Sequence, residues 1–549
     1  GIEVNRTSNG EVNGMQILNN SVLSNSLNGI RLVASNLVNQ DTYTINQNTV
    51  STNGLDGIQL RVEADSSIFA TIDRNVITNN GTLLDPVFGS GIHSVEQANT
   101  ATDLRFLAGL VTRNTITGNN LDGIDLNSSM TTLVIGDPVD TTLGNLISAN
   151  HRNGVNVEGP GEVTIGSNVI SLNGTAGTVG TINETAGVKA NVRPTSNLTI
   201  VNNQIINNIG DGIEYSIVQG SFGSSQVQIV KNNIAFNDGR GVDILNRGGN
   251  FIQVLMDQNI VNRNLLEGVY VVNTSSTTQN QFNRSTDPLD QNGSVFAVPI
   301  IEMQFTNNQV IGNGFSTSAF PVAPSATGLV VKVGTSDAST SVNDPGGFAS
   351  VGSAIAIGGN PFGESTGRGG VTMVVDNNQF GGNFGDDILF QSFTSTGTPG
   401  TGTAWDPTAN PPTFNTAGYQ SDPLARLDVH FHNNTFDTTD VNNSAGIGTA
   451  TATNSNQTVA YYNDADGLFK SRLTSQGAPG PFTSATRRRN AQRQASRTVS
   501  PFTGPVANQT YLYPGVGDST FRISTDSDQS QFLIDFVVPN GTSLDQNGD

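Results

Sequence analysis

The chain has no cysteine, a single tryptophan and few aromatic residues, which make up 6% of its 549 residues. Without cysteine it has no disulfide framework, no thiol nucleophile and no thiolate metal site. Lysine is also scarce, at Lys189, Lys231, Lys332 and Lys470 only, and the formal net charge is −20. Because nucleic acids and anionic membranes are bound mainly through clustered basic residues, we expect neither as a partner. No apolar run is long enough to cross a bilayer, so we also expect no membrane insertion.

The sequence instead contains a recurring motif, called the phrase below. An asparagine is followed two residues later by an aliphatic residue or phenylalanine, five residues later by a second asparagine, and then by a glycine-aliphatic pair. The best-matched copies place the two asparagines at Asn48 and Asn53, Asn114 and Asn119, Asn145 and Asn150, and Asn168 and Asn173. One copy, anchored at Asn233, is weaker, because Ala235 fills its apolar position and Asp238 its second asparagine position. Glycine before the aliphatic residue suits a backbone with positive φ.

Each repeat contains three short alternating strands separated by turn residues, and it recurs after roughly 25 to 34 residues. Strands this short and regular predict one coil of a three-sided solenoid, with apolar residues stacked inside from coil to coil. The paired asparagines are then expected to form hydrogen-bonded ladders at the turns. We predict an all-β, three-sided solenoid of about twelve or thirteen coils over residues 1–455.

These features resemble the right-handed parallel β-helix superfamily with pectate-lyase-like coils, and especially the large Asn-rich repeat proteins of bacterial cell envelopes. The resemblance implies the fold and a secreted or cell-surface location. It does not specify an activity, because the superfamily contains lyases, hydrolases, epimerases, adhesins and structural proteins.

The repeat is interrupted by polar insertions near 273–300, 314–327, 336–370 and 392–420, and it ends near residue 455. Residues 456–549 carry clustered aromatics and a basic run, and we predict a separate extension or cap. The chain opens within a coil, at Gly1, Ile2 and Val4. We expect either assembly through the two ends or, equally, a fragment of a longer solenoid whose preceding residues cover this coil. The opening coil would be met by a neighbour's extension, through the set Arg487, Arg488, Arg489, Phe521, Phe532 and Phe536.

The sequence contains no complete catalytic motif. Asp386 and Asp387 resemble the paired aspartates of polygalacturonase-type hydrolases, but the accompanying Gly-His-Gly and Arg-Ile-Lys motifs are missing. Arg240 and Arg263 lack the acidic clusters that a lyase needs. His430 and His432 lie on one strand face without a third metal ligand nearby. We therefore expect no catalytic residue and no metal ligand.

Four acidic turn residues could hold calcium between coils, namely Asp56, Asp122, Asp211 and Glu267, but the glycine-rich nonapeptide of calcium-binding β-rolls is absent. We therefore expect no cofactor, with calcium as the alternative. The preferred function is structural: an extracellular solenoid that self-associates, head-to-tail or laterally, into a filament, stalk or envelope layer. The alternatives are a carbohydrate-active enzyme, either lyase or hydrolase, and an adhesin that binds a cell-surface glycan.

Overall fold

The computed structural model describes most of the repeat region and a few strands beyond it. The described residues are 1–6, 14–35, 40–63, 66–82, 88–97, 105–127, 131–159, 161–174, 185–192, 196–217, 224–246, 251–273, 300–314, 328–334, 369–381, 383, 388–393, 425–437, 458–463, 511–512, 520–522 and 531–536. The chain divides into two compact units: unit 1 comprises Gly1–Ser216 and Ser225–Val242, and unit 2 comprises Ile217–Ser224 and Asp243–Asp549.

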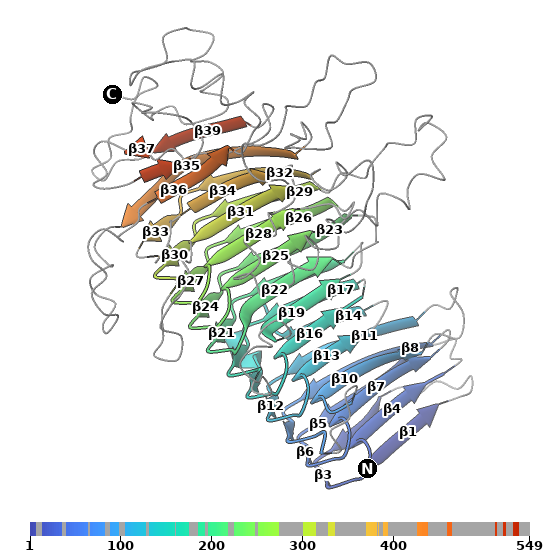
Figure 1. Cartoon of the computed structure of the whole chain (residues 1–549). Helices are drawn as coiled ribbons and strands as arrows, with labels where there is room; N and C mark the ends of the chain where they lie inside the picture. Colours follow the sequence, from blue (N-terminus) through green and yellow to red (C-terminus); the bar gives the residue numbers. More distant parts are fainter. Residues whose placement is uncertain are drawn as a thin grey trace, which may run out of the picture. The chain divides into compact units, whose positions relative to one another are not determined.

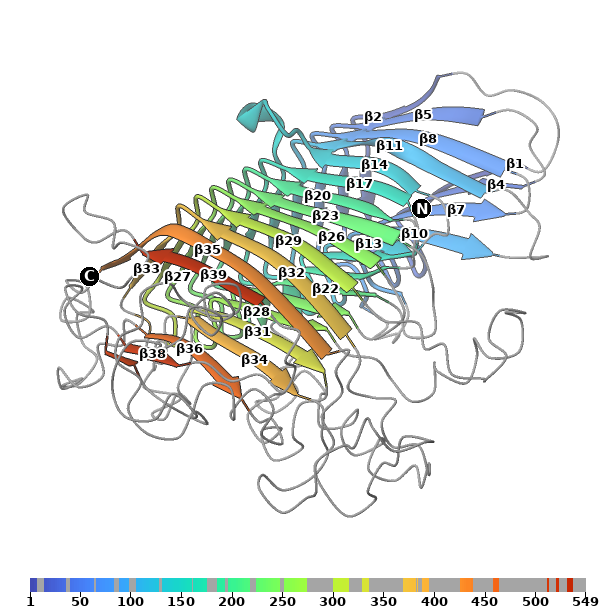
Figure 2. The same cartoon turned by 90° about the horizontal axis from the view of Figure 1, so that it is seen from above.

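Unit 1 consists of three parallel sheets that each coil of the chain visits in turn. Sheet A contains β1 (Ile2–Arg6), β4 (Ile30–Ala34), β7 (Ile58–Glu63), β10 (Ile92–Gln97), β13 (Ile124–Asn127), β16 (Val155–Glu158), β19 (Ala186–Val192) and β22 (Asp211–Ile217). Sheet B contains β2 (Met15–Leu18), β5 (Gln40–Asn46), β8 (Ser66–Asp73), β11 (Arg105–Thr112), β14 (Thr131–Gly136), β17 (Gly161–Gly166), β20 (Asn197–Val201) and β23 (Ser224–Val230). Strands β5, β8, β11, β14 and β17 lie side by side in that order (Figure 2).

Sheet C is the narrowest, with strands of three residues. It contains β3 (Ser21–Leu23), β6 (Thr49–Ser51), β9 (Val76–Thr78), β12 (Thr115–Thr117), β15 (Leu146–Ser148), β18 (Val169–Ser171), β21 (Gln204–Ile206) and β24 (Asn233–Ala235). A single-turn 3₁₀ helix, η1 (Thr141–Leu143), lies between β14 and β15. The short strands line one edge of the coils (Figure 1).

The core of unit 1 consists of aliphatic side chains stacked in register. In sheet A, Ile92 pairs with Ile58 on one side and with Ile124 on the other. In sheet C, Ile147 lies between Ile116 and Ile170. All of these side chains are at most 1% exposed, and burying one aliphatic side chain stabilises the fold by about 1.5–3 kcal/mol. Because side chains on a strand alternate between faces, the residues between them point outward.

Unit 2 repeats the three-sheet pattern with longer interruptions. Its sheet A strands are β25 (Val242–Asn246), β28 (Val269–Asn273), β31 (Leu329–Gly334), β34 (Ile388–Phe393), β36 (Thr458–Asn463), β38 (Thr520–Arg522) and β37 (Tyr511–Leu512). Sheet B contains β26 (Phe251–Asp257), β29 (Ile300–Thr306), β32 (Gly369–Asp376), β35 (Ala425–Asp437) and β39 (Gln531–Phe536). Sheet C contains β27 (Ile260–Asn262), β30 (Gln309–Ile311) and β33 (Gln379–Gly381), and the end of β35 pairs with β33.

The insertions expected in the later coils fall between successive strands, and their residues lie largely outside the described ones. The coil resumes in register after them, as where Val269 pairs with Leu329. All described pairings are parallel except that of β37 with β38. The predicted all-β, three-sided parallel solenoid is therefore confirmed.

The described strands beyond residue 455 pair with the sheets of unit 2. β36 pairs with β34, β38 pairs with β36, and β39 pairs with β35, all in parallel. The sequence predicted a separate extension or cap here, because the asparagine repeat stops. The described strands beyond that point add to the edges of the sheets without the repeat.

Candidate functional site

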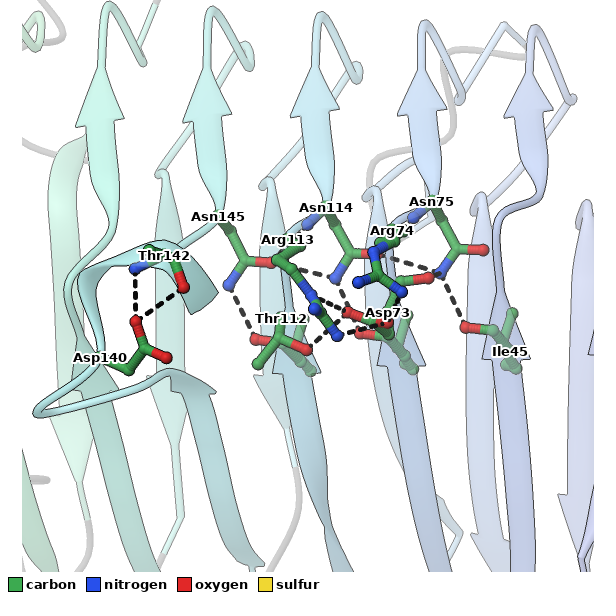
Figure 3. A network of polar contacts seen from close by, with 12 residues as sticks. Ile45, Asp73, Arg74, Asn75, Thr112, Arg113, Asn114, Asp140, Thr142 and Asn145 are labelled. Atoms are coloured by element: carbon green, nitrogen blue, oxygen red, sulfur yellow. Dashed lines mark hydrogen bonds and ion pairs between the residues drawn. The ribbon is translucent and has the colours of Figure 1, made fainter.

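Two ladders of asparagine run along the corners on either side of sheet C. In unit 1 the first ladder contains Asn20, Asn48, Asn75, Asn114, Asn145, Asn168, Asn203 and Asn232, and the second contains Asn25, Asn53, Asn80, Asn119, Asn150, Asn173, Asn208 and Asn237. All eight asparagines expected from the best-matched copies lie in these ladders. Figure 3 shows Asn75, Asn114 and Asn145 in successive coils.

Asn114 shows how a ladder side chain within the stack uses its full hydrogen-bonding capacity. Asn114 Oδ1 accepts from the backbone N–H of Asn75 at 2.8 Å and from its Nδ2 at 3.0 Å. Asn114 Nδ2 donates to Ile72 O at 2.8 Å and to Asn145 Oδ1 at 3.0 Å. A primary amide offers two donors and two lone pairs, so nothing at this buried position is left unsatisfied.

The residue before most ladder asparagines has positive φ, which turns the chain sharply at these corners. Gly144, before Asn145, is an exception, with φ −63°. Non-glycine residues occupy this conformation at Ala149 (φ 54°), Leu172 (φ 58°) and Phe236 (φ 58°). This conformation costs an L-residue about 1–2 kcal/mol. The ladder hydrogen bonds offset that cost.

The copy anchored at Asn233 was placed one residue out of register. The structure places Asn232 and Asn237 in the ladders, and Ile234, paired with Ile205, in the core. The apparent defects at Ala235 and Asp238 follow from this shift. Asn232 and Asn233 are consecutive, so either could be the first asparagine of the repeat. The apolar position distinguishes them, because only the register that begins at Asn232 places Ile234 there.

The glycine of the glycine-aliphatic pair is required for close approach, and the expected positive φ is not found. Gly123, for example, does not have positive φ. A Cβ there would lie 2.6 Å from Gly154 O, 2.6 Å from Ile147 Cγ2 and 2.8 Å from Asn150 Nδ2. The next coil therefore leaves room only for hydrogen.

A charged clasp reinforces one corner of unit 1. Asp73 accepts hydrogen bonds from Thr112 Oγ1 at 2.9 Å, from Arg113 Nε at 2.7 Å and from Arg113 Nη2 at 2.8 Å (Figure 3). Arg113 immediately precedes the ladder residue Asn114 and has positive φ. The clasp therefore holds a strained corner residue to the preceding coil.

The outer face of sheet A in unit 1 carries a row of polar side chains, one from each coil. The backbone register aligns Glu3, Arg31, Gln59, His93, Asp125, Asn156 and Lys189. Arg31 bonds to Glu3 at 2.7 Å and to Gln59 at 3.0 Å. Asn156 donates to Asp125 at 2.9 Å. The row is the candidate functional site, because His93 and Asp125 within it, and Asp122 in the turn beside it, are buried groups whose pKa values are shifted.

His93 lies at the centre of this row, between carboxylates of the two adjacent coils. Its Nδ1 is 3.0 Å from Asp56 Oδ2 and its Nε2 is 3.4 Å from Asp125 Oδ2. Burial disfavours the charged imidazolium, but the hydrogen bond and charge of Asp56 outweigh burial and raise the pKa of His93 above its ordinary value. The charges of Asp125 and Asp122 act in the same direction.

Two further carboxyls of the cluster are perturbed by burial. Burial and then repulsion from Asp125 raise the pKa of Asp122 to about 7. Burial also raises the pKa of Asp125, against the opposing charge of His93. Perturbed groups of this kind occur both in functional sites and in structural ion-pair networks.

A cavity of about 380 Å³ adjoins this cluster. Its polar lining includes Arg31, Gln59 and Arg61, and its apolar lining includes Leu55 and Phe88. These residues come from successive coils, so the cavity lies along the side of the coils, between the turns and the outer face of sheet A. Its volume falls in the range of small-molecule sites.

Residues 105–286 match the family model of the right handed beta helix region. This stretch is a right-handed β-helix. Comparison with curated proteins and with solved structures found no match. The match agrees with the three parallel sheets of the structure, whereas the function has to be argued from the residues.

Only some of the metal and acid-base candidates of the sequence lie among the described residues. Asp386 and Asp387 lie outside the described residues. His430 and His432 lie in β35, where His432 is in register with Asp376 and Asp535. Among the described residues, no group of three or more histidine, aspartate or glutamate side chains could hold a metal ion.

The acidic turn residues hold the next coil. Asp56 Oδ1 accepts the backbone N–H groups of Gly89 and Ser90, and its Oδ2 accepts from Gln59. Asp122 accepts from the backbone and side chain of Asn153, and Asp211 accepts the backbone N–H of Arg240. These carboxylates therefore cap turns in the way that the ladder asparagines cap corners.

The residues expected to join chains are placed only in part. Gly1 donates to Asn25 Oδ1, and Ile2 and Val4 pair with Ile30 and Leu32 in sheet A. At the other end, Phe521 pairs with Val459, Phe532 with Val429 and Phe536 with Asn434. Arg487, Arg488 and Arg489 lie outside the described residues. Within this chain, β38 pairs with β36 and β39 pairs with β35.

Sequence reasoning missed the His93 cluster. His93 follows the glycine-aliphatic pair Gly91-Ile92 by one position, which is the first outward position of sheet A. Aligning the repeats by that pair places His93 between Gln59 and Asp125, so the signal was present in the register of the phrase.

In the described part of the chain, no helix is long and apolar enough to cross a membrane.

Proposed function

We propose that this protein is an extracellular structural β-helix, a rigid subunit of a filament, stalk or envelope layer. The observation that carries the proposal is the pair of continuous asparagine ladders on either side of sheet C in unit 1. A ladder bond is made only when two consecutive coils are in register, so each coil fixes the next. Repeat proteins with such nearest-neighbour coupling are suited to spanning distance without bending.

The charged groups of the described coils support the same proposal. Asp56, Asp122 and Asp211 each bind backbone N–H groups of the following coil. A carboxylate with its lone pairs used in this way is a poor general base, since proton transfer would break the bonds that hold the turn. The geometry therefore favours a scaffold over a catalyst.

Electron microscopy of the native material tests the structural proposal. We expect periodic filaments or layers in which the β-helix is the repeating subunit, on the outside of the cell. Dispersed monomers at the cell surface would contradict the assembly part of the proposal, and an internal location would contradict the extracellular part.

The cavity beside Arg31 favours a second candidate function, binding of an acidic glycan. Two guanidinium groups, an amide and the Phe88 ring line it. Arginine pairs with carboxylates in a planar, bidentate geometry, and an aromatic ring can pack against a sugar face. Glu3 already engages Arg31 at 2.7 Å, so an acidic sugar would have to displace it.

Polygalacturonate and a neutral glucan separate the alternatives. Glycan recognition predicts binding of polygalacturonate that weakens at least tenfold in Arg31→Gln and in Phe88→Ala, with no binding of the neutral glucan. Equal binding by both variants would rule out this cavity. Depolymerisation of polygalacturonate that is lost in Asp125→Asn would instead favour the enzymatic alternative over the scaffold.

A further inference from the structure

We propose that His93 is a pH-sensitive clamp that fastens three consecutive coils of unit 1 when it is doubly protonated and loosens them when it loses a proton. The clamp joins the coils that contribute β7, β10 and β13. It is independent of the proposed function, because it rests on the contacts of one buried side chain.

With Asp56 and Asp125 ionised, the contacts of His93 favour a proton on each ring nitrogen. Asp56 Oδ2 lies 3.0 Å from Nδ1, and Asp125 Oδ2 lies 3.4 Å from Nε2. Both oxygens are acceptors when their carboxyl groups are ionised. A neutral imidazole has a single N–H, so it can donate to one of the two carboxylates only. The other carboxylate would then face a nitrogen lone pair.

The His93 side chain is buried, so water cannot readily replace a hydrogen bond that it loses. His93 is 3% exposed and Asp56 is 0% exposed. Asp56 also accepts the N–H groups of Gly89 and Ser90, which lead into the strand that carries His93. Loss of the proton therefore weakens a connection that is buried and anchored at both ends.

The other charged groups around His93 reinforce this behaviour. Asp122 repels Asp125 and is itself drawn toward Arg152, and Glu158 adds negative charge beside Asp125. Arg61 on the neighbouring strand β7 is engaged by Glu63 at 2.7 Å. The surroundings of the imidazole are therefore dominated by carboxylates.

The direction of the pH effect follows from linkage. The folded pKa of His93 is raised, so its stabilising contribution is complete below about pH 6.5 and is lost as the pH rises through the folded value. The pKa of Asp122 is raised to about 7, so the folded state also holds this proton more tightly, and stability falls between about pH 4 and 7. Both groups therefore favour the closed coils in acid, and both contributions are lost as the pH rises.

The clamp is connected to the wall of the cavity. Gln59 lines the cavity and donates to the same Asp56 oxygen that faces His93. Phe88 also lines it, and its ring centroid lies 5.7 Å from that of His93. A change at His93 therefore reaches two residues of the cavity lining.

A histidine titration followed by NMR tests the protonation directly. The chain has four histidines, so the resonance of His93 is assigned by its loss in His93→Gln. We expect it to titrate above the ordinary histidine value, and to titrate lower in Asp125→Asn than in the wild type. Titration at or below the ordinary value, or no change in Asp125→Asn, would overturn the proposal.

Hydrogen exchange measures the loosening itself. After correction for intrinsic rates, amides of 88–97 should exchange about tenfold faster for each unit of pH within the titration window. In His93→Gln this dependence should disappear above pH 7, whereas His151→Gln, a substitution at a half-buried bend, should keep it. A dependence that survives in His93→Gln would assign the effect to another group.

Discussion

The outer face of sheet A differs between the two units, although the coils that carry it follow the same pattern. In unit 1 the outward positions carry Arg31, Gln59, His93 and Asp125, joined by hydrogen bonds and ion pairs. In unit 2 the outward positions carry an apolar cluster of Leu245, Tyr270, Val272 and Val330, none more than 4% exposed. The inner aliphatic rows and the asparagine ladders are present in both. The skeleton of the coil is therefore independent of what its outer face carries.

This independence has a physical reason. Strand residues alternate between faces, so an outward substitution leaves the inner stack unchanged. The corners are held by the hydrogen bonds of the ladder asparagines, and the outward residues are not part of these ladders. The outer face can therefore be polar in one unit and apolar in the other.

The largest expected effect is loss of a ladder residue, and it should be equal in the two units. Asn114→Ala and Asn308→Ala each remove a buried side chain that bonds to both neighbouring coils. We expect each to lower the free energy of unfolding by about 3–5 kcal/mol, because several buried partners lose their bonds. Denaturation followed by circular dichroism measures the loss, with the exposed Asn127→Ala as control. A much smaller loss in one unit would show that the ladders are not equivalent.

The next effect should separate the units. Tyr270→Ala removes a large buried side chain from the apolar cluster of unit 2, and we expect a loss of about 3 kcal/mol. Gln59→Ala, on the outer face of unit 1, removes bonds to Arg31 and Asp56 and should cost about 1 kcal/mol. Equal losses of unfolding free energy would mean that the outer faces of sheet A contribute equally to stability in the two units.

The sequence was sufficient to predict the coil, its core and its asparagine corners. It was not sufficient to predict the contacts on the outer face of sheet A. The spacing of Asn114, Ile116 and Asn119 predicts both the corner and the core, because each of these positions in the coil accepts only one type of residue. The outward positions accept many types of residue, so they show no such pattern. His93 becomes a candidate only when Asp56 and Asp125 are known to lie beside it, and the carboxylates come from residues 37 and 32 positions away in sequence, as the numbering shows. The end of the repeat phrase also marked no end of the sheets, since strands can pair without asparagine corners.

A smaller effect is expected from filling the close approach before sheet A. Gly123→Ala in unit 1 and Gly268→Ala in unit 2 each place a Cβ within 2.8 Å of the next coil. Overpacking of this kind costs about 1–3 kcal/mol. The two losses should agree, because the skeleton is common to both units. Gly14→Ala is the control, since a Cβ there meets nothing within 4 Å and only its φ of 76° opposes the change. No loss of stability in Gly123→Ala would show that the next coil moves aside to admit the methyl group.

The smallest effect should come from the exposed end of the polar row. Glu3 pairs with Arg31 at 2.7 Å, but the side chain of Glu3 is 54% exposed. Ion pairs of this kind contribute about 0–1 kcal/mol and are screened by salt. We expect Glu3→Gln to change the free energy of unfolding by less than about 0.5 kcal/mol at 0.15 M salt, with no further change at 1 M. Arg31 would keep its bond to Gln59, which is largely buried. A loss above about 1 kcal/mol would show that the row stabilises unit 1 through its charges. A loss near zero would leave the buried contacts of His93 as the part of this face that matters for folding.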